Sequence, residues 1–264
     1  MGAENIGVWF LAGYYTLLII PLGVMLWFRV PIIGKTLSAV LRMTLQLLFV
    51  GLYLQVVFRL NNPWLNSLWL LVMVGVADVS IARGCGLRLG RFVIPLFGAL
   101  VAGTAVPLIA FVGPLLKRPN LMDAQYVIPI GGMILGNCLR ADMIGIRHFY
   151  EAIRKGEKTF LLALSHGARL HEALRPYLRD ACRAALLPTV ATMATIGLVA
   201  LPGMMTGVIL GGANPMTAIK YQIGIMIAIF TGTAITVILA ILMSVKVSFT
   251  PYGTLDPGAF RKRP

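Results

Sequence analysis

Apolar stretches long enough to cross a lipid bilayer occupy most of this sequence. Hydrophobic residues make up 58% of the chain and charged residues 12%, about half the charged share of an ordinary soluble domain. About 20 apolar residues cross a bilayer, and by that measure we predict seven spans: Ile6–Phe28, Ser38–Phe58, Trp64–Ala82, Phe92–Leu116, Tyr126–Leu139, Thr189–Leu210 and Tyr221–Val245. The sequence therefore predicts an all-α, polytopic integral membrane protein with about seven transmembrane helices.

The basic residues lie mainly on one side of these predicted spans. Of the 23 lysines and arginines, 19 fall on the side that holds the C-terminus, and four fall on the other: Arg59, Lys117, Arg118 and Lys220. Because loops rich in basic residues stay in the cytoplasm, we predict that the N-terminus is outside and the C-terminus inside. The formal charge of +14 does not indicate a nucleic-acid partner, since the basic residues lie between apolar spans rather than on a folded soluble face.

One long polar segment, residues 140–188, separates the fifth predicted span from the sixth. It holds nine basic residues and all three histidines, and we predict that it is a cytoplasmic loop within a single membrane domain, residues 1–264. Gly156 and Gly167 divide it into two amphipathic pieces. From Arg169 onward, apolar residues recur every three or four positions along one side of a predicted helix. That side could bind lipid headgroups, the membrane domain of the same chain, or a separate protein subunit.

The two spans that flank this loop look unsuited to a regular membrane helix. Tyr126–Leu139 is 14 residues long and contains a proline and three glycines, and the sixth span is split by LPGMMTG and ends in GGANP. Short or interrupted spans indicate a transport site, because irregular backbone at membrane depth must be buried in protein or line a wet cavity. The alternative is that the glycines let helices pack closely. The predicted transport path comprises Asn137, Pro202, Gly203, Met204, Met205 and Asp78.

Two of these candidates are polar side chains at membrane depth. Asn137 carries an amide that must find a hydrogen-bond partner. Asp78 lies well inside a predicted span, where a carboxylate is a functional candidate, although an ion pair with Arg83 is an alternative. Methionines crowd into the second half of the chain, where their sulfur atoms could pass a soft metal ion or simply fill space. The sequence leaves the metal ligands, if any, unknown.

The sequence provides no group that would make this chain an enzyme. The triplet Gly34–Thr36 resembles the end of a phosphate-binding loop, but that loop needs a glycine at position 29, which is Arg29. No set of serine, histidine and aspartate and no pair of intramembrane carboxylates supports hydrolysis. We therefore expect a transport protein that binds no cofactor itself. An ion-coupled secondary transporter or channel remains an alternative.

Four motifs together resemble the signature of the UPF0014 permeases, a family with bacterial iron-export permeases and plant aluminium-tolerance permeases. They are VIPIGGMILGN (127–137), LSHGAR (164–169), DACRAALLPTV (180–190) and GLVALPGMMTGVILGGANPMTAIKYQI (197–223). The resemblance covers roughly residues 42–247. It implies the membrane subunit of an ABC transporter that exports iron or another metal ion or complex, with export of a sugar nucleotide as an alternative.

The resemblance also implies partners and a docking segment. ATP and Mg²⁺ would bind a separate ATPase subunit, and the chain would act as a homodimer in the inner (plasma) membrane. The motif LSHGAR is similar to the short glycine-containing coupling segment of ABC permeases. We therefore predict that Glu157, Leu164, Gly167, Ala168 and Arg169 couple the chain to its ATPase.

Overall fold

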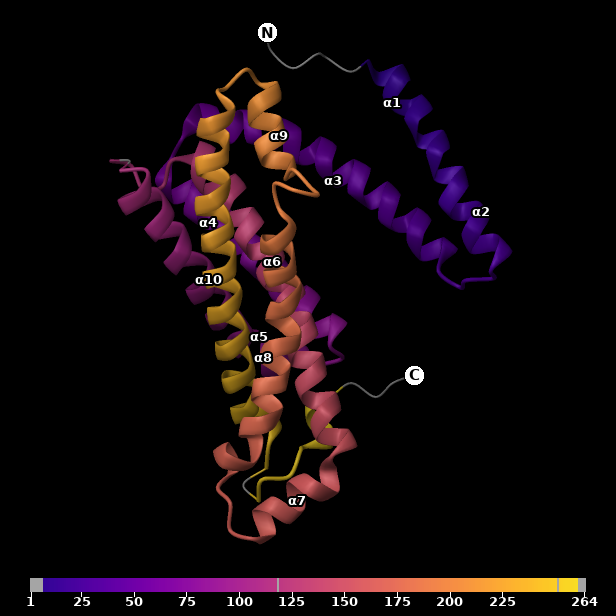
Figure 1. The fold of residues 1–264 in the computed structure, drawn as a ribbon, viewed down its shortest axis with the longest axis vertical. Coiled ribbons are helices and arrows are strands. Elements are labelled where there is room, and N and C mark those ends of the chain that lie inside the picture. The colour runs from indigo at the N-terminus through magenta and orange to yellow at the C-terminus, as the bar shows by residue number, and fades with distance from the viewer. Residues whose placement is uncertain (1–6, 118, 251, 261–264) are drawn as a thin grey trace.

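The computed structural model describes residues 7–117, 119–250 and 252–260, and these form helices joined by short connections (Figure 1). Ile6, Arg118, Arg261, Lys262 and Arg263, which entered the predictions of spans and orientation, lie outside the described residues. The α-helices are α1 (Val8–Tyr14), α2 (Ile19–Trp27), α3 (Ile33–Leu60), α4 (Pro63–Gly84), α5 (Leu89–Ala110), α6 (Ala124–Lys155), α7 (Glu157–Ser165), α8 (Leu170–Thr195), α9 (Gly203–Leu210) and α10 (Pro215–Ser248). The predicted all-α class is confirmed. Short 3₁₀ turns at Tyr15–Leu18 and Pro257–Ala259 and a π-helical turn at Phe111–Leu115 complete the described elements.

Four long helices, α4, α5, α6 and α10, form the core of the bundle. Helix α10 packs along both α5 and α6, and α4 packs on α5 and α6. Helices α5 and α10 approach closely at two glycines: a Cβ atom added to Gly232 on α10 would lie 2.7 Å from the Gly103 carbonyl oxygen on α5. Without side chains at these two positions the backbones can approach closely, which is how membrane helices gain packing energy.

The N-terminal helices α1, α2 and α3 form a hairpin that leans away from this bundle (Figure 1). The Tyr15 hydroxyl lies 2.5 Å from the Thr44 hydroxyl and joins the two arms of the hairpin. The hairpin meets the bundle mainly near the end of α3, where Val57 packs against Ala124 and Ile128 of α6. Most other side chains of the hairpin are apolar and exposed, so this part of the chain presents its surface to lipid or to another protein.

The prediction of a short, irregular fifth span is wrong. A single helix, α6, runs for 32 residues from Ala124 to Lys155, through the region expected to be the start of a loop. Gly131 and Gly132 allow close packing and do not interrupt the helix, since a Cβ atom at Gly131 would lie 2.8 Å from the Leu70 side chain of α4 and one at Gly132 would lie 3.2 Å from Met73. Asp123 caps the helix by accepting a hydrogen bond from the Gln125 N–H at 3.2 Å.

The predicted interruption of the sixth span is confirmed. Helix α8 ends at Thr195, and the chain then turns through residues 196–202 before the short helix α9. Gly197 has a φ of +84°, which favours glycine, and Pro202 directly precedes α9. Of the described helices, six stretches are long and apolar enough to cross a membrane, and the α8–α9 segment is not among them.

Residues 140–188, predicted to connect two spans and to contain amphipathic helices, are almost entirely helical. They comprise the second half of α6, the short helix α7 and most of α8, and the helices change at Gly156 and Gly167 as predicted. The apolar side of α8 packs on α6 and α10, so the membrane domain of the same chain covers much of it. Ala173, Leu174 and Ala181 are buried there.

Candidate transport cavity and coupling segment

A cavity of about 490 Å³ lies between α6, α8, α9 and α10. Four of the six predicted transport-path residues line it, namely Asn137, Pro202, Gly203 and Met204. Helix α6 forms one wall, and the end of α8 and the turn after it form another. The break between α8 and α9 therefore borders the cavity, which agrees with the rule that irregular backbone in a membrane lines a cavity or is buried in protein.

Asn137 is positioned by its own helix. Its Nδ2 atom donates to the Met133 carbonyl at 2.8 Å, and its Oδ1 atom accepts from Arg140 Nη2 at 3.2 Å. Both polar atoms of the amide are thus hydrogen-bonded, as a polar group away from water requires. Arg140 itself lines the cavity, and it is the one charged side chain among the described residues that do so.

The remaining polar surface of the cavity comes from hydroxyl and amide groups. Thr189, Thr192 and Thr195 reach it from α8, and Gln222 reaches it from α10. Gln222 is 8% exposed, and within the described part of the chain its Oε1 atom has no hydrogen-bond partner. An unpaired buried amide is costly, so this oxygen is available to a molecule that enters the cavity.

Arg140 and Gln222 were missed by the sequence predictions. Arg140 was assigned to a cytoplasmic loop, although it follows Asn137 by three residues and would share its face on a continuous helix. The absence of any proline or glycine between these two residues was the signal that the helix continues. Gln222 stands within an otherwise apolar run on α10, and that isolated polar position was its only signal.

The other two predicted path residues lie outside the cavity. Met205 is 9% exposed and lines a neighbouring apolar pocket of about 430 Å³ beside α10, which shares Pro202 and Gln222 with the cavity. Asp78 is fully buried on α4, and both its carboxylate oxygens lack a hydrogen-bond partner within the described part of the chain. The alternative of an ion pair between Asp78 and Arg83 is not what the structure shows.

A second buried carboxylate, Asp142 on α6, is not among the predicted site residues, because the sequence predicts a loop at this position. It is fully buried, and its oxygens have no hydrogen-bond partner of good geometry among the described residues. The nearby Thr236 hydroxyl on α10 donates to the Thr233 carbonyl at 3.2 Å instead. Asp142 does not line the cavity, and no group of three or more potential metal ligands occurs in the described part of the chain.

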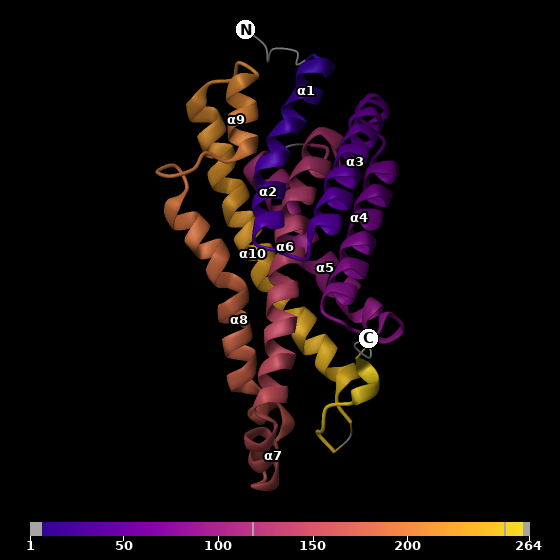
Figure 2. The same cartoon turned by 90° about the vertical axis from the view of Figure 1, so that its right-hand side faces the viewer.

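The predicted coupling residues gather around α7, at the end of the molecule opposite α9 (Figures 1 and 2). Glu157 begins α7, and Gly167 ends it with a φ of +90°. The Gly167 N–H donates to the Leu164 carbonyl at 3.0 Å and the Ala168 N–H to the Ala163 carbonyl at 3.1 Å, a pair of bonds typical of a glycine-terminated helix. The Arg169 N–H then donates to Glu172 Oε2 at 2.8 Å and opens α8.

Helix α7 packs against the bundle on one side and is exposed on the other. The buried Phe160 ring lies 6.1 Å from the Tyr177 ring and 6.0 Å from the Phe249 ring, measured between centroids. The next two residues, Leu161 and Leu162, are 38% and 57% exposed. A short helix held at the tip of the bundle with exposed leucines is suited to bind another protein.

Comparison with known protein families shows to which family the chain belongs. A family model described as "Uncharacterised protein family (UPF0014)" matches residues 8–249. The chain belongs to this family. The resemblance noted from the four sequence motifs is thereby confirmed.

Three relatives of known sequence show how far the similarity extends. "UPF0014 membrane protein slr1647" of Synechocystis sp. is 37% identical, over 80% of this chain and 82% of the relative. "Protein ALUMINUM SENSITIVE 3" of Arabidopsis thaliana is 32% identical, over 73% and 69%. "Probable iron export permease protein FetB" of Escherichia coli is 31% identical, over 78% of each. No solved structure matches the chain. Together with the six apolar helices, these relatives show a multi-pass membrane protein of a permease family.

Proposed function

We propose that this chain is the membrane subunit of an ABC transporter, with ATP hydrolysed by a separate subunit that binds α7. The observation that supports this most is the cavity beside the α8–α9 break, because irregular backbone beside a cavity with polar groups in its wall indicates a transport site. Helix α8 runs from the cavity to the coupling segment at Gly167 and Arg169. A movement of α7 would therefore reach the cavity through one continuous helix.

The proposal is tested by a pull-down of the tagged protein in mild detergent, with mass spectrometry of the proteins that co-purify and an ATPase assay. We expect an ATPase subunit with a phosphate-binding loop, whose activity depends on the permease. Recovery of the chain without such a partner would contradict the ABC assignment. In that case an ion-coupled transporter would be the better assignment, with the two buried carboxylates, Asp78 and Asp142, as its first candidates.

We propose further that two copies of the chain form the working transporter, each with one ATPase subunit. The α1–α3 hairpin supports this, because its apolar surface is hardly covered by the chain's own bundle. The same pull-down checks the stoichiometry by native mass measurement. A complex with a single permease chain would contradict the homodimer.

For the substrate we propose export of iron, on the similarity to FetB, with the metal carried as a complex rather than as a bare ion. The described residues that line the cavity include no carboxylate, imidazole or thiol, and iron ions favour such ligands. The Arg140 guanidinium would repel a bare cation and attract an anion. The same residue favours the alternative substrate, a sugar nucleotide, whose phosphates carry negative charge.

Arg140→Gln is expected to lower transport of an anionic substrate at least tenfold, because a charge-assisted hydrogen bond contributes about 1.5–3 kcal/mol. Arg140→Lys, which keeps the charge, should retain more activity. The measurement is substrate-stimulated ATPase activity in proteoliposomes, with a citrate complex of iron and a sugar nucleotide compared at equal concentration. Higher activity in Arg140→Gln than in the native protein would contradict the anion assignment.

A further inference from the structure

A second and larger cavity, of about 870 Å³, lies where α4 ends, beside the lower half of α6. Four basic side chains line this cavity, which we call the Arg147 pocket: Arg83, Arg147, Arg154 and Lys155. Glu151 is the one acid among its described lining residues. Among the described residues, the pocket shares none with the transport cavity or with the coupling segment. The roles proposed for the transport cavity and the coupling segment therefore do not explain the net positive charge of this pocket.

Two of the three arginines of the pocket, Arg147 and Arg154, are held in place by groups that do not neutralise them. Arg147 Nη2 donates to the Gly84 carbonyl at 2.7 Å, and the Arg154 guanidinium lies 4.0 Å from the centre of the Phe260 ring. Phe260 is fixed in turn, because the adjacent Ala259 carbonyl accepts a hydrogen bond from the Arg88 N–H at 3.1 Å. The guanidinium groups are thus positioned in advance, with their positive charge still available to a ligand.

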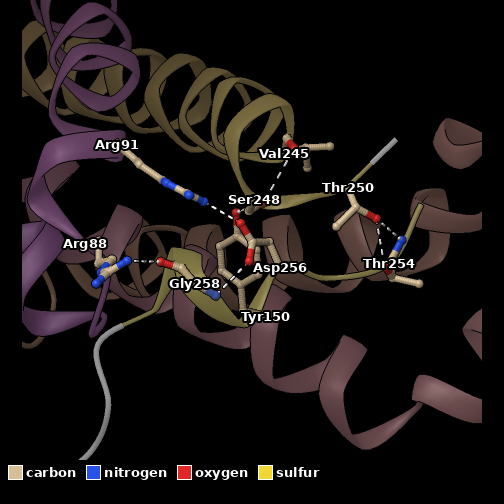
Figure 3. Close-up of polar contacts among 9 residues, drawn as sticks. All are labelled: Arg88, Arg91, Tyr150, Val245, Ser248, Thr250, Thr254, Asp256 and Gly258. Atoms are coloured by element: carbon tan, nitrogen blue, oxygen red, sulfur yellow. Dashed lines mark hydrogen bonds and ion pairs between the residues drawn. The ribbon is translucent and has the colours of Figure 1, made fainter. Parts of the chain in front are cut away.

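The acid of the C-terminal segment is engaged elsewhere. Asp256 forms an ion pair with Arg91 of α5 and accepts from the Gly258 N–H at 2.7 Å (Figure 3). The hydrogen bond from Arg91 has the largest effect on the Asp256 carboxyl, and together with that from Gly258 it lowers the pKa of this group below its ordinary value. Tyr150, which lines the pocket, has its hydroxyl 2.7 Å from Ser244 and 2.9 Å from Ser248 on α10. Among the described residues, the C-terminal segment thus contributes the Phe260 ring to the lining of the pocket and no carboxylate.

The depth of the pocket matches the headgroup layer of a membrane. Gly84 is the last residue of a membrane-spanning helix, and Arg147 contacts it. Arg154 lies seven residues further along α6, or about 10 Å at the rise of an α-helix. The predicted orientation places this end of the bundle on the cytoplasmic side, where anionic lipids concentrate.

We propose that the Arg147 pocket binds a phosphoryl group, supplied by the headgroup of an anionic phospholipid of the inner leaflet. Guanidinium groups bind phosphate oxygens through paired, charge-assisted hydrogen bonds. Basic pockets between membrane helices on the cytoplasmic side recognise such headgroups. A zwitterionic lipid carries its own cation and gains less from the four basic side chains.

The test uses the full-length protein, stripped of lipid in detergent and then given phosphatidylglycerol, phosphatidylcholine or inorganic phosphate. Native mass spectrometry counts the retained lipid, and thermal unfolding reports stabilisation. We expect retention of phosphatidylglycerol and not of phosphatidylcholine. If inorganic phosphate stabilises the protein equally and displaces phosphatidylglycerol, the site belongs to a soluble phosphate and the lipid assignment is overturned.

Variants of the pocket separate a built site from general attraction to charge. Arg83→Gln with Lys155→Gln removes two cations whose side chains make no hydrogen bond or ion pair within the described structure. We expect the affinity for phosphatidylglycerol to fall about 30-fold, since each basic residue at the membrane surface contributes a factor of roughly five. Arg175→Gln with Arg179→Gln removes the same charge from the exposed side of α8. This double variant should leave the affinity for phosphatidylglycerol unchanged. Equal losses in both double variants would overturn the proposal.

Discussion

Replacing Gly167 with aspartate is expected to abolish the stimulation of ATPase activity by the permease, while the protein still inserts and dimerises. Gly167 has a φ of +90°, and a Cβ atom there meets nothing within 4 Å in this chain. Aspartate tolerates such a backbone better than most residues. The substitution strains the backbone at this turn but meets no described neighbour, so the permease should still fold and insert. Its effect on ATPase stimulation should fall on whatever docks against the coupling segment, where it adds bulk and negative charge.

Two controls distinguish docking from backbone strain. Gly212→Asp places the same side chain at a similar φ, +92°, between α9 and α10 and far from α7, so stimulation should persist. Gly167→Asn has nearly the same shape without the charge, and it shows whether bulk or charge blocks docking. The measurement is ATPase activity of the reconstituted complex. Normal stimulation in Gly167→Asp would refute the coupling assignment.

Replacing Gly232 with alanine is expected to destabilise the bundle by about 1–3 kcal/mol, the usual cost of overpacking a close contact. The added Cβ would lie 2.7 Å from the Gly103 carbonyl oxygen and 2.8 Å from Ile134 Cγ2. The first of these atoms belongs to backbone and cannot move aside without shifting α5 against α10. The measurement is the midpoint of thermal unfolding in detergent, which should fall.

Gly136→Ala on α6 is the matched control for this prediction. Gly136 is exposed, and a Cβ atom there meets nothing within 4 Å. Alanine should therefore leave the unfolding midpoint unchanged or raise it, because glycine in a helix interior costs about 0.5–1 kcal/mol relative to alanine. A larger loss of stability in Gly136→Ala than in Gly232→Ala would show that the glycine contact does not limit packing.

Composition and local pattern were enough to predict several features. The apolar stretches predicted the membrane class and five of the six long helices with their approximate positions, because a span must be apolar along its whole length. Gly156 and Gly167 predicted the ends of α6 and α7, and Pro202 with its neighbouring glycines predicted the break before α9. Each of these features depends on the residues next to it in the chain.

The sequence failed where a residue's role depends on the helix that lies opposite. The glycines of α6 looked like breakers, yet α4 supplies side chains that fill the space above Gly131 and Gly132, and the helix continues. That error placed Arg140 and Asp142 in a loop, whereas one lines the cavity and the other is buried in the bundle. Charged residues such as Arg140 and Asp142 do not end a helix when neighbouring helices continue alongside it.

The sequence by itself therefore determined the membrane class, the family and the local breaks, since these follow from hydropathy and from backbone chemistry. The tertiary structure alone decided which polar groups share a space. Asn137, Arg140 and Gln222 meet in one cavity because α6 and α10 pack side by side, whereas Asp78 and Met205 lie outside it. Such proximity is a property of helix contacts between distant parts of the chain, which local spacing does not encode.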